Sequence, residues 1–263
     1  MKVFDAWDAY AVKEFVREGY VVYRGIFSVH DVVACKKFVV DRFRPGRDPH
    51  EQAVRIMDAL ALQPFFKDIA EGISALNIMR QYLGPDVALF NYDALWINVP
   101  KDKNPVLLKG QHTDAWTGTS VNTIFAKVFL TDVDKHNGIA VSPGSHLQGM
   151  LPVRNRAIDP HSKAKFKSVN LDTIRAGDWL IWHPLLVHAT VGHSAKNTRI
   201  SITSRYTSTE TPFSSQERAL GYRTLSVGPM NQILRLVGND YLTPLRTYGG
   251  TVAIDKRLKA IYG

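Results

Sequence analysis

The sequence predicts a mainly β fold of the sandwich type, with helices packed on one side. Short β-rich segments recur between about residues 87 and 207, turn residues separate them, and the first 85 residues have a helical pattern. Many short strands punctuated by glycine and proline are typical of sandwiches and barrels. The 263-residue chain contains no repeat or linker. We therefore expect a single domain with a helical support (about 1–85), a β core (about 86–208) and a C-terminal extension (about 209–263).

The N-terminal part is predicted to be helical apart from one early strand. Residues 19–25 form a glycine-bounded run of β-branched and aromatic residues, which is typical of a strand. Ser28, followed by Asp31, resembles the capping box that begins a helix. An apolar stripe at helical spacing follows, made of Val29, Val32, Val33, Val39 and Phe43. A further helical stretch runs from about Gln52 to Leu83 and ends at Gly84-Pro85.

The β core is predicted from six short segments, near residues 87–99, 121–130, 139–142, 178–182, 185–191 and 198–207. Turn residues separate them, at Pro100, Asn137-Gly138, Pro143-Gly144 and Gly177-Asp178. Beyond residue 214 the pattern is mixed, with a short helix expected at Asn231–Leu236.

The composition excludes several classes of protein. The single cysteine, Cys35, excludes an internal disulfide and cysteine-rich zinc sites. No apolar run reaches the ~18 residues of a membrane span, and the acidic N-terminus does not resemble a signal peptide, so we expect a cytoplasmic protein without a membrane partner. The net charge of +9 would attract an anionic small molecule or a nucleic acid. No feature of the sequence predicts an oligomeric state.

The candidate metal site begins at His112 and Asp114, which are two residues apart. On a strand such residues point to the same face. One imidazole and one carboxylate are two of the three ligands of a facial iron(II) triad. His188, held among apolar strand residues, is the best candidate for the third ligand. Three other histidines compete on spacing alone: His136, His183 and His193. We interpret His183, beside Trp182, as a core histidine.

An arginine and a serine extend this site. Arg199 and Ser201 follow His188 by eleven and thirteen residues and share one strand face. An α-keto acid cosubstrate bound to iron needs a cation for its distal carboxylate, and the planar guanidinium pairs with carboxylates through two hydrogen bonds. Ser201 is expected to donate one more.

In this order and spacing, the motifs resemble the phytanoyl-CoA dioxygenase-like family of iron(II)/2-oxoglutarate oxygenases. The resemblance extends from about Phe15 to Tyr206. The segments that carry it are Gly19–Ser28, His112-Thr113-Asp114, Asn137-Gly138, Pro143–His146, Gly177-Asp178 ahead of His188, and Arg199-x-Ser201.

The resemblance implies a double-stranded β-helix, that is, a cupin-like jelly roll at about 86–208. It implies that His112, Asp114 and His188 are the catalytic iron ligands and that Arg199 anchors 2-oxoglutarate. By position, Thr190 and Leu95 would also contact the cosubstrate. Many relatives carry tryptophan where this chain has Val128 and Phe129, so an aromatic cosubstrate contact there is not carried over.

The implied reaction consumes O₂ and 2-oxoglutarate, hydroxylates a C–H bond of a small molecule, and releases succinate and CO₂. Halogenases of this scaffold have Ala or Gly in place of the carboxylate, so Asp114 favours hydroxylation over halogenation. Four residues are expected near the substrate: Trp96, Trp116, Lys109 and Arg205. Basic residues among aromatic ones suit an anionic substrate, although a solvated loop would have the same composition.

Two alternatives remain. One is a catalytically inactive, cupin-like binding or sensory module, against which the complete set of site residues argues. The other is an AlkB-like nucleic-acid demethylase, because Arg199 and Arg205 are six residues apart as in that group. The segment Gly19–Ser28 fits the phytanoyl-CoA dioxygenase-like family better, so no nucleic-acid partner is expected.

Overall fold

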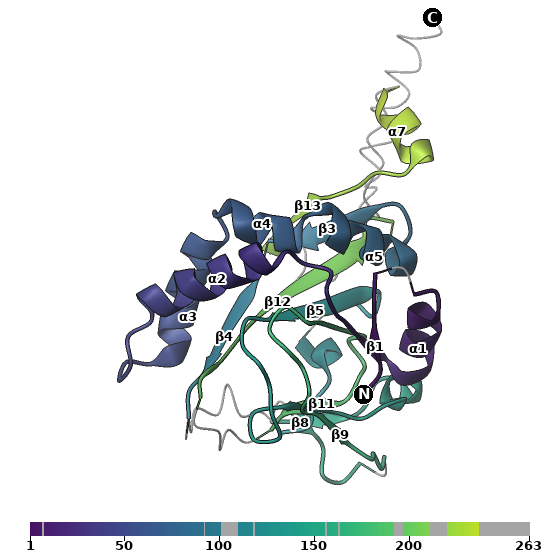
Figure 1. Cartoon of the computed structure of the whole chain (residues 1–263). Helices are drawn as coiled ribbons and strands as arrows, with labels where there is room; N and C mark the ends of the chain where they lie inside the picture. Colours follow the sequence, from purple (N-terminus) through teal and green to yellow (C-terminus); the bar gives the residue numbers. More distant parts are fainter. Residues whose placement is uncertain are drawn as a thin grey trace, which may run out of the picture.

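Two β-sheets face each other, and helices cover the outer side of the larger sheet (Figure 1). The computed structural model describes residues 1–6, 8–91, 93–100, 110–117, 119–155, 157–162, 164–191, 197–210 and 220–236. The helices are α1 (Tyr10–Glu18), α2 (Val29–Arg42), α3 (Pro49–Leu60), α4 (Pro64–Ala70), α5 (Ile73–Leu83), α7 (Pro229–Leu236) and the 3₁₀ helices η1 (Asp114–Thr117) and η2 (Ser145–Gln148). None of the described helices combines the length and the apolar character that a bilayer crossing requires.

The larger sheet has eight strands and the smaller sheet three. The larger contains β1 (Val3–Phe4), β2 (Tyr20–Tyr23), β10 (Trp179–Trp182), β5 (Thr123–Phe129), β12 (Arg199–Ser208), β3 (Val87–Phe90) and β13 (Tyr222–Thr224) in this spatial order, and β4 (Ala94–Asn98) pairs with β12. The smaller contains β11 (His188–Thr190), β6 (Ile139–Val141) and β9 (Val169–Leu171); β7 (Val153–Arg154) and β8 (Ala157–Ile158) form a separate pair. The mainly β fold with helices on one side is confirmed.

The N-terminal helices differ from the prediction in three details. Helix α2 begins after Ser28 as expected, but its buried face is Val32, Cys35 and Val39, while Val29 and Val33 are 79% and 56% exposed. The Ser28 side chain makes no capping hydrogen bond. The predicted stretch 52–83 is divided among three helices. It breaks at Pro64, the first residue of α4, because proline cannot continue a preceding helix.

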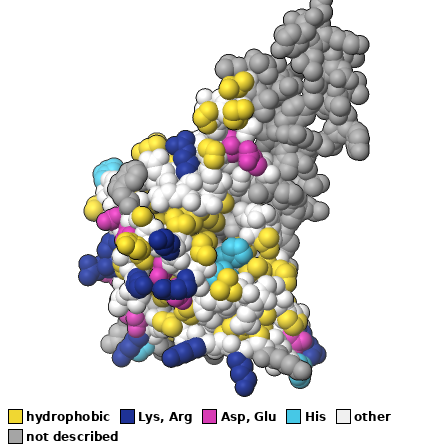
Figure 2. Space-filling view, turned by 90° about the vertical axis from the view of Figure 1, so that its right-hand side faces the viewer, with side chains coloured by type: hydrophobic (Ala, Val, Ile, Leu, Met, Phe, Trp, Pro, Cys, Tyr) yellow, Lys and Arg dark blue, Asp and Glu magenta, His cyan; other side chains and the backbone are white. Residues whose placement is uncertain are grey.

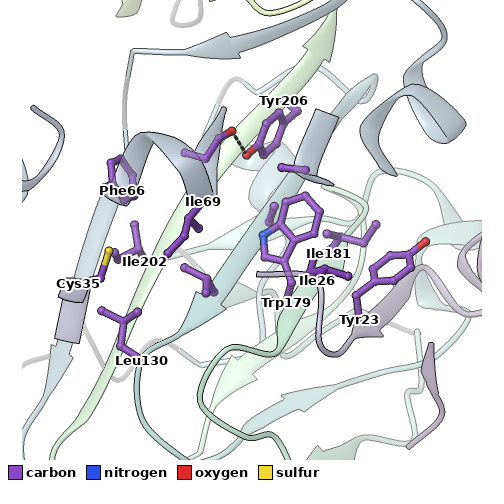
Figure 3. Packing of buried hydrophobic residues seen from close by; sticks show 14 of the residues in the cluster. Tyr23, Ile26, Cys35, Phe66, Ile69, Leu130, Trp179, Ile181, Ile202 and Tyr206 are labelled. Carbon is purple, nitrogen blue, oxygen red and sulfur yellow. Dashed lines mark hydrogen bonds between the residues drawn. The ribbon is translucent and has the colours of Figure 1, made fainter. Parts of the chain in front are cut away.

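The outer hydrophobic core fills the space between the helices and the larger sheet (Figure 3). Alternate residues of β12 supply it, with Ile200, Ile202 and Tyr206 buried against the helices. The Tyr206 hydroxyl donates a 2.6 Å hydrogen bond to the Ala70 carbonyl at the end of α4. This polar contact ties β12 to the helical layer.

The inner hydrophobic core lies between the two sheets. Phe125, Phe129 and Trp182 of the larger sheet cluster with Ile139 and Val141 of the smaller sheet. The remaining residues of β12, including Arg199 and Ser201, therefore point to this inner side. The two facing sheets are the walls of a jelly roll, and the candidate site residues lie between them.

Two of the family-like motifs have structural roles. Asp178, 1% exposed, receives two hydrogen bonds from the Arg24 guanidinium, at 2.8 and 2.6 Å, and so joins the turn before β10 to the end of β2. Ser145, after Pro143-Gly144, accepts the backbone N–H of Val187 at 2.9 Å. The second contact holds the chain next to His188.

Candidate metal centre

His112 and His188 lie directly opposite each other across an isolated antiparallel bridge. Each backbone N–H donates to the carbonyl of the other residue, at 2.9 Å in both directions. Residues that exchange both hydrogen bonds face each other with their side chains on one side. The two imidazole rings consequently lie together, with centroids 4.3 Å apart.

Both imidazoles are held in the same tautomer. The Nδ1 of His112 lies 2.9 Å from the Gly110 carbonyl, and the Nδ1 of His188 lies 3.0 Å from the Leu186 carbonyl. A carbonyl oxygen only accepts hydrogen bonds, so each Nδ1 carries the proton. The lone pair is then on Nε2 in both rings. Histidines that bind metals commonly donate their other ring N–H in this way.

Asp114 completes the cluster, although not in the predicted manner. The expectation that His112 and Asp114 share a regular strand is wrong, because Asp114 is the first residue of the 3₁₀ helix η1. Its backbone N–H donates to the Pro184 carbonyl at 2.8 Å, which ties the start of η1 to the chain ahead of His188. Its Oδ2 lies 3.6 Å from Nε2 of His188 and accepts the indole N–H of Trp182 at 2.9 Å.

Ligand-type atoms of His112, Asp114 and His188 all lie within 4.8 Å of one another. Among the described residues, the competing histidines do not belong to this cluster. His136 is exposed, and His183 packs against His146 with ring centroids 5.7 Å apart. Burial, the largest cause, and the nearby His146 lower the pKa of His183 to about 4, against the opposing effect of a backbone hydrogen bond at Val121. His193 lies outside the described residues.

Arg199 is a buried cation held only by neutral oxygens. It is 2% exposed, and it donates to the Asn98 side-chain oxygen from Nε and Nη2 and to the carbonyls of Asn137 and Gly138 from Nη1. Burial lowers the pKa of the guanidinium to about 10. Within the described part of the chain no carboxylate pairs with it. Because an unpaired buried charge is costly, this arrangement favours an anionic ligand.

Ser201 lies beside Arg199 on the same face of β12, opposite Phe129 of β5. It is fully buried, and its hydroxyl has no hydrogen-bond partner in the described structure. A buried hydroxyl without a partner is rare and indicates a missing acceptor or donor. Phe129 is one of the two residues that stand where many relatives carry tryptophan. Its ring packs in the inner core, on the same side of the sheet as Ser201.

The guanidinium of Arg199 lies at the far end of β11 from His188. The Gly138 carbonyl accepts Nη1 of Arg199 at 2.8 Å and the backbone N–H of Val191 at 3.1 Å. Val191 is three residues past His188, which corresponds to about 10 Å along a strand. Thr190 lies between them on the same face as His188. This separation suits a five-carbon dicarboxylate that reaches from a metal to Arg199.

Leu95 is not brought to this site. In β4, Asn98 and Trp96 lie opposite Arg199 and Ser201 and share their inner face. Leu95 lies on the other face and packs in the outer core beneath the helices. A residue three positions from Asn98 on a strand necessarily faces away from it.

The predicted substrate residues are only partly described. The Trp96 indole donates to the Thr203 hydroxyl at 3.1 Å, and the Arg205 guanidinium lies 5.4 Å from the centre of the Phe125 ring. The backbone of Trp116 lies in η1, and Lys109 is outside the described residues. Lys127 was not predicted from the sequence; its Nζ lies 5.3 and 5.9 Å from the ring centres of Trp96 and Trp182.

Three further residues of the site were also missed: Asn98, Asn137 and Trp182. Asn98 and Asn137 hold Arg199 from 101 and 62 residues away along the chain. No local pattern indicates such contacts. Trp182 was detectable in part, because the alternation of β10 puts it on the inner face with Leu180.

A family model provides the first comparison with known proteins. The model described as phytanoyl-CoA dioxygenase (PhyH) matches residues 15–201. Comparison with curated protein sequences finds no match.

Solved structures provide the second comparison. A structure described as the non-heme monooxygenase ThoJ, apo form, has a TM-score of 0.65 and 16% identity, covering 95% of this chain and 98% of that one. The epimerase SnoN in complex with Fe3+, alpha ketoglutarate and nogalamycin RO has a TM-score of 0.62 and 18% identity, covering 83% and 89%. EctD from S. alaskensis with 2-oxoglutarate and 5-hydroxyectoine has a TM-score of 0.59 and 19% identity, covering 80% and 79%. At such low identities the likeness establishes the fold.

Proposed function

Because this chain belongs to the phytanoyl-CoA dioxygenase family, we propose that it hydroxylates a C–H bond of a small, anionic organic molecule and releases succinate and CO₂. As a member of this family, the protein is an iron- and 2-oxoglutarate-dependent oxygenase. The observation that carries the proposal for its active site is the convergence of His112, Asp114 and His188, with ligand-type atoms within 4.8 Å.

The donor set fits iron(II). Two imidazoles whose Nδ1 atoms face backbone carbonyls, together with one carboxylate, are the ligand types of non-haem iron(II) oxygenases. When bound with 2-oxoglutarate, the metal supplies the activation of O₂. In this proposal His112, Asp114 and His188 would hold the metal. The retained carboxylate of Asp114 favours hydroxylation over halogenation.

The buried residues beyond the triad fit the cosubstrate. In this proposal Arg199 pairs with the distal carboxylate of 2-oxoglutarate, Ser201 donates its otherwise unused hydroxyl, and Thr190 lines the path between them. The SnoN and EctD structures contain alpha ketoglutarate and 2-oxoglutarate respectively, which supports this reading. The apolar inner core around Phe129 and Val141 keeps water from this part of the site.

The substrate class is inferred from cations on the inner face of the larger sheet. In the β5–β12 pair, Lys127 lies opposite Thr203 and Arg205 lies opposite Phe125. Both cations are on the same face of the sheet as Trp182, which donates a hydrogen bond to Asp114. Trp96 borders Lys127. A cation near the triad, in a chain of net charge +9, favours a substrate with a carboxylate, phosphate or phosphonate group. Lys109 and Trp116 remain further candidates for contact with it.

A nucleic-acid substrate is less favoured than a small molecule. Proteins that bind the phosphate backbone of a nucleic acid present a basic patch or stripe on their surface. On the face drawn in Figure 2, basic side chains are interspersed with acidic and hydrophobic ones.

Succinate formation tests the proposal directly. We expect His112→Ala and Asp114→Ala to abolish substrate-dependent conversion of 2-oxoglutarate to succinate while circular dichroism shows an intact fold. His136→Ala, an exposed histidine outside the cluster, is the matched control and should retain full turnover. Undiminished turnover in either triad variant would remove that residue from the site. A protein that binds iron and 2-oxoglutarate but turns over no substrate would support an inactive binding module.

The substrate class is tested with matched pairs of compounds. Organic acids and their neutral amides are compared as substrates of the unaltered protein and of Lys127→Met. We expect the unaltered protein to prefer the acids and Lys127→Met to lose that preference. Equal rates for acids and amides in the unaltered protein would contradict an anionic substrate.

A further inference from the structure

We propose that Trp182 is a positioning residue, whose indole N–H orients the Asp114 carboxylate and thereby sets the affinity of the site for its metal. The inference rests on the proposed iron site and deepens it. The hydrogen bond is 2.9 Å long and reaches Oδ2, the oxygen that lies 3.6 Å from Nε2 of His188. The indole ring also lies beside His188, with centroids 5.5 Å apart.

The donor is held rigidly. Trp182 ends β10, a strand paired on both sides, and lies opposite Tyr20 of β2 and Phe125 of β5. Its ring stacks on that of Phe125, with centroids 5.4 Å apart and planes inclined by 23°, and it is 5% exposed. The indole N–H therefore cannot move far without disturbing the sheet.

The acceptor has less support from its own backbone. Asp114 begins a four-residue 3₁₀ helix instead of continuing a strand. The hydrogen bond from its N–H to the Pro184 carbonyl fixes the backbone but does not itself orient the carboxylate. The indole N–H restricts these torsions, and by occupying Oδ2 it favours metal binding through one carboxylate oxygen at a time. Partners of this kind commonly contribute 10- to 100-fold to metal affinity.

A purely structural role makes a different prediction. A buried indole needs an acceptor, and Asp114 would then merely satisfy it. In that case removal of the N–H would change the stability of the fold but not the affinity for metal. Trp182→Phe keeps an aromatic ring against Phe125 and removes the donor. Trp179→Phe is the matched control, because Trp179 is 2% exposed on the same strand but faces the outer core.

The test is calorimetric titration of the metal-free proteins with Mn(II). We expect Trp182→Phe to bind Mn(II) about 10- to 100-fold more weakly than the unaltered protein, while Trp179→Phe binds with unchanged affinity. Unchanged affinity in folded Trp182→Phe would overturn the inference and leave the iron site intact. Failure of the unaltered protein to bind Mn(II) would contradict the iron site itself and this inference with it.

A second measurement needs no change at Trp182. The assigned indole N–H resonance of Trp182 is followed by nuclear magnetic resonance during titration with diamagnetic Zn(II). We expect it to shift on metal binding and to be unresponsive in Asp114→Ala. If Zn(II) binds to the unaltered protein and the chemical shift of this resonance does not change, the inference is overturned.

Discussion

The buried hydroxyl of Ser201 allows the effects of one substitution on folding and on binding to be separated. Ser201 is fully buried, and its Oγ has no partner in the described structure. An unsatisfied buried hydroxyl costs about 1–3 kcal/mol. Ser201→Ala should therefore raise the free energy of unfolding of the ligand-free protein, by up to that amount. In chains of this size each kcal/mol corresponds to roughly 2–4 °C in Tm.

The same substitution should weaken cosubstrate binding. A hydrogen bond to a charged group contributes about 1.5–3 kcal/mol, so the Kd for 2-oxoglutarate should rise roughly 10- to 150-fold. Thr209→Val is the matched control, because Thr209 also has a buried hydroxyl without a partner, at the end of β12. It should stabilise the protein without changing the Kd. Thermal unfolding and calorimetry in the presence of Mn(II) give both quantities. A Ser201→Ala protein that binds 2-oxoglutarate as the unaltered protein does would refute the assignment.

Two further predictions concern stability. Gly19 has φ of +82°, and a Cβ there would lie 2.5 Å from the His146 ring, so Gly19→Ala should cost at least about 1–3 kcal/mol of unfolding free energy. Gly46 has φ of +87° and open space around it, so Gly46→Ala measures the backbone strain alone and should cost less unfolding free energy. Equal losses for the two variants in urea unfolding would show that the contact with His146 contributes nothing. The pKa of His183 is about 4 in the folded state against 6.5 ordinarily, so the unfolded chain takes up the proton first as pH falls. The contribution of neutral His183 to the free energy of unfolding is therefore complete above pH 6.5 and is lost toward pH 4, by about 1–2 kcal/mol after allowance for solvent screening. His183→Gln should reduce this loss. Equal dependence of the unfolding free energy on pH in the two proteins would contradict the prediction.

Much of the site was predictable from the sequence because it depends on short spacings. The i, i+2 relation of Arg199 and Ser201 on one strand holds, and so does the selection of His188 from among apolar strand residues. The same rule shows why Leu95 was misplaced. Once Asn98 is known to face Arg199, alternation puts Trp96 on the inner face and Leu95 on the outer one.

The remainder depends on contacts between distant segments. Nothing near Asp114 indicates that η1 begins there, because the turn is held by the Pro184 carbonyl, 70 residues later in the numbering. The pairing of the Arg199 guanidinium with Asn98 and with the Asn137-Gly138 turn likewise requires the folded sheets. In α2, the stripe of valines was recognised, but which face is buried is decided by the helices that pack against it.

The most direct test of the central claim is the anaerobic titration of the iron(II)-loaded protein with 2-oxoglutarate, followed by visible absorption. We predict a metal-to-ligand charge-transfer band that saturates at one equivalent, is missing in His188→Ala and needs a higher 2-oxoglutarate concentration in Arg199→Ala. A band of full intensity in His188→Ala, or no band in the unaltered protein, would contradict the account.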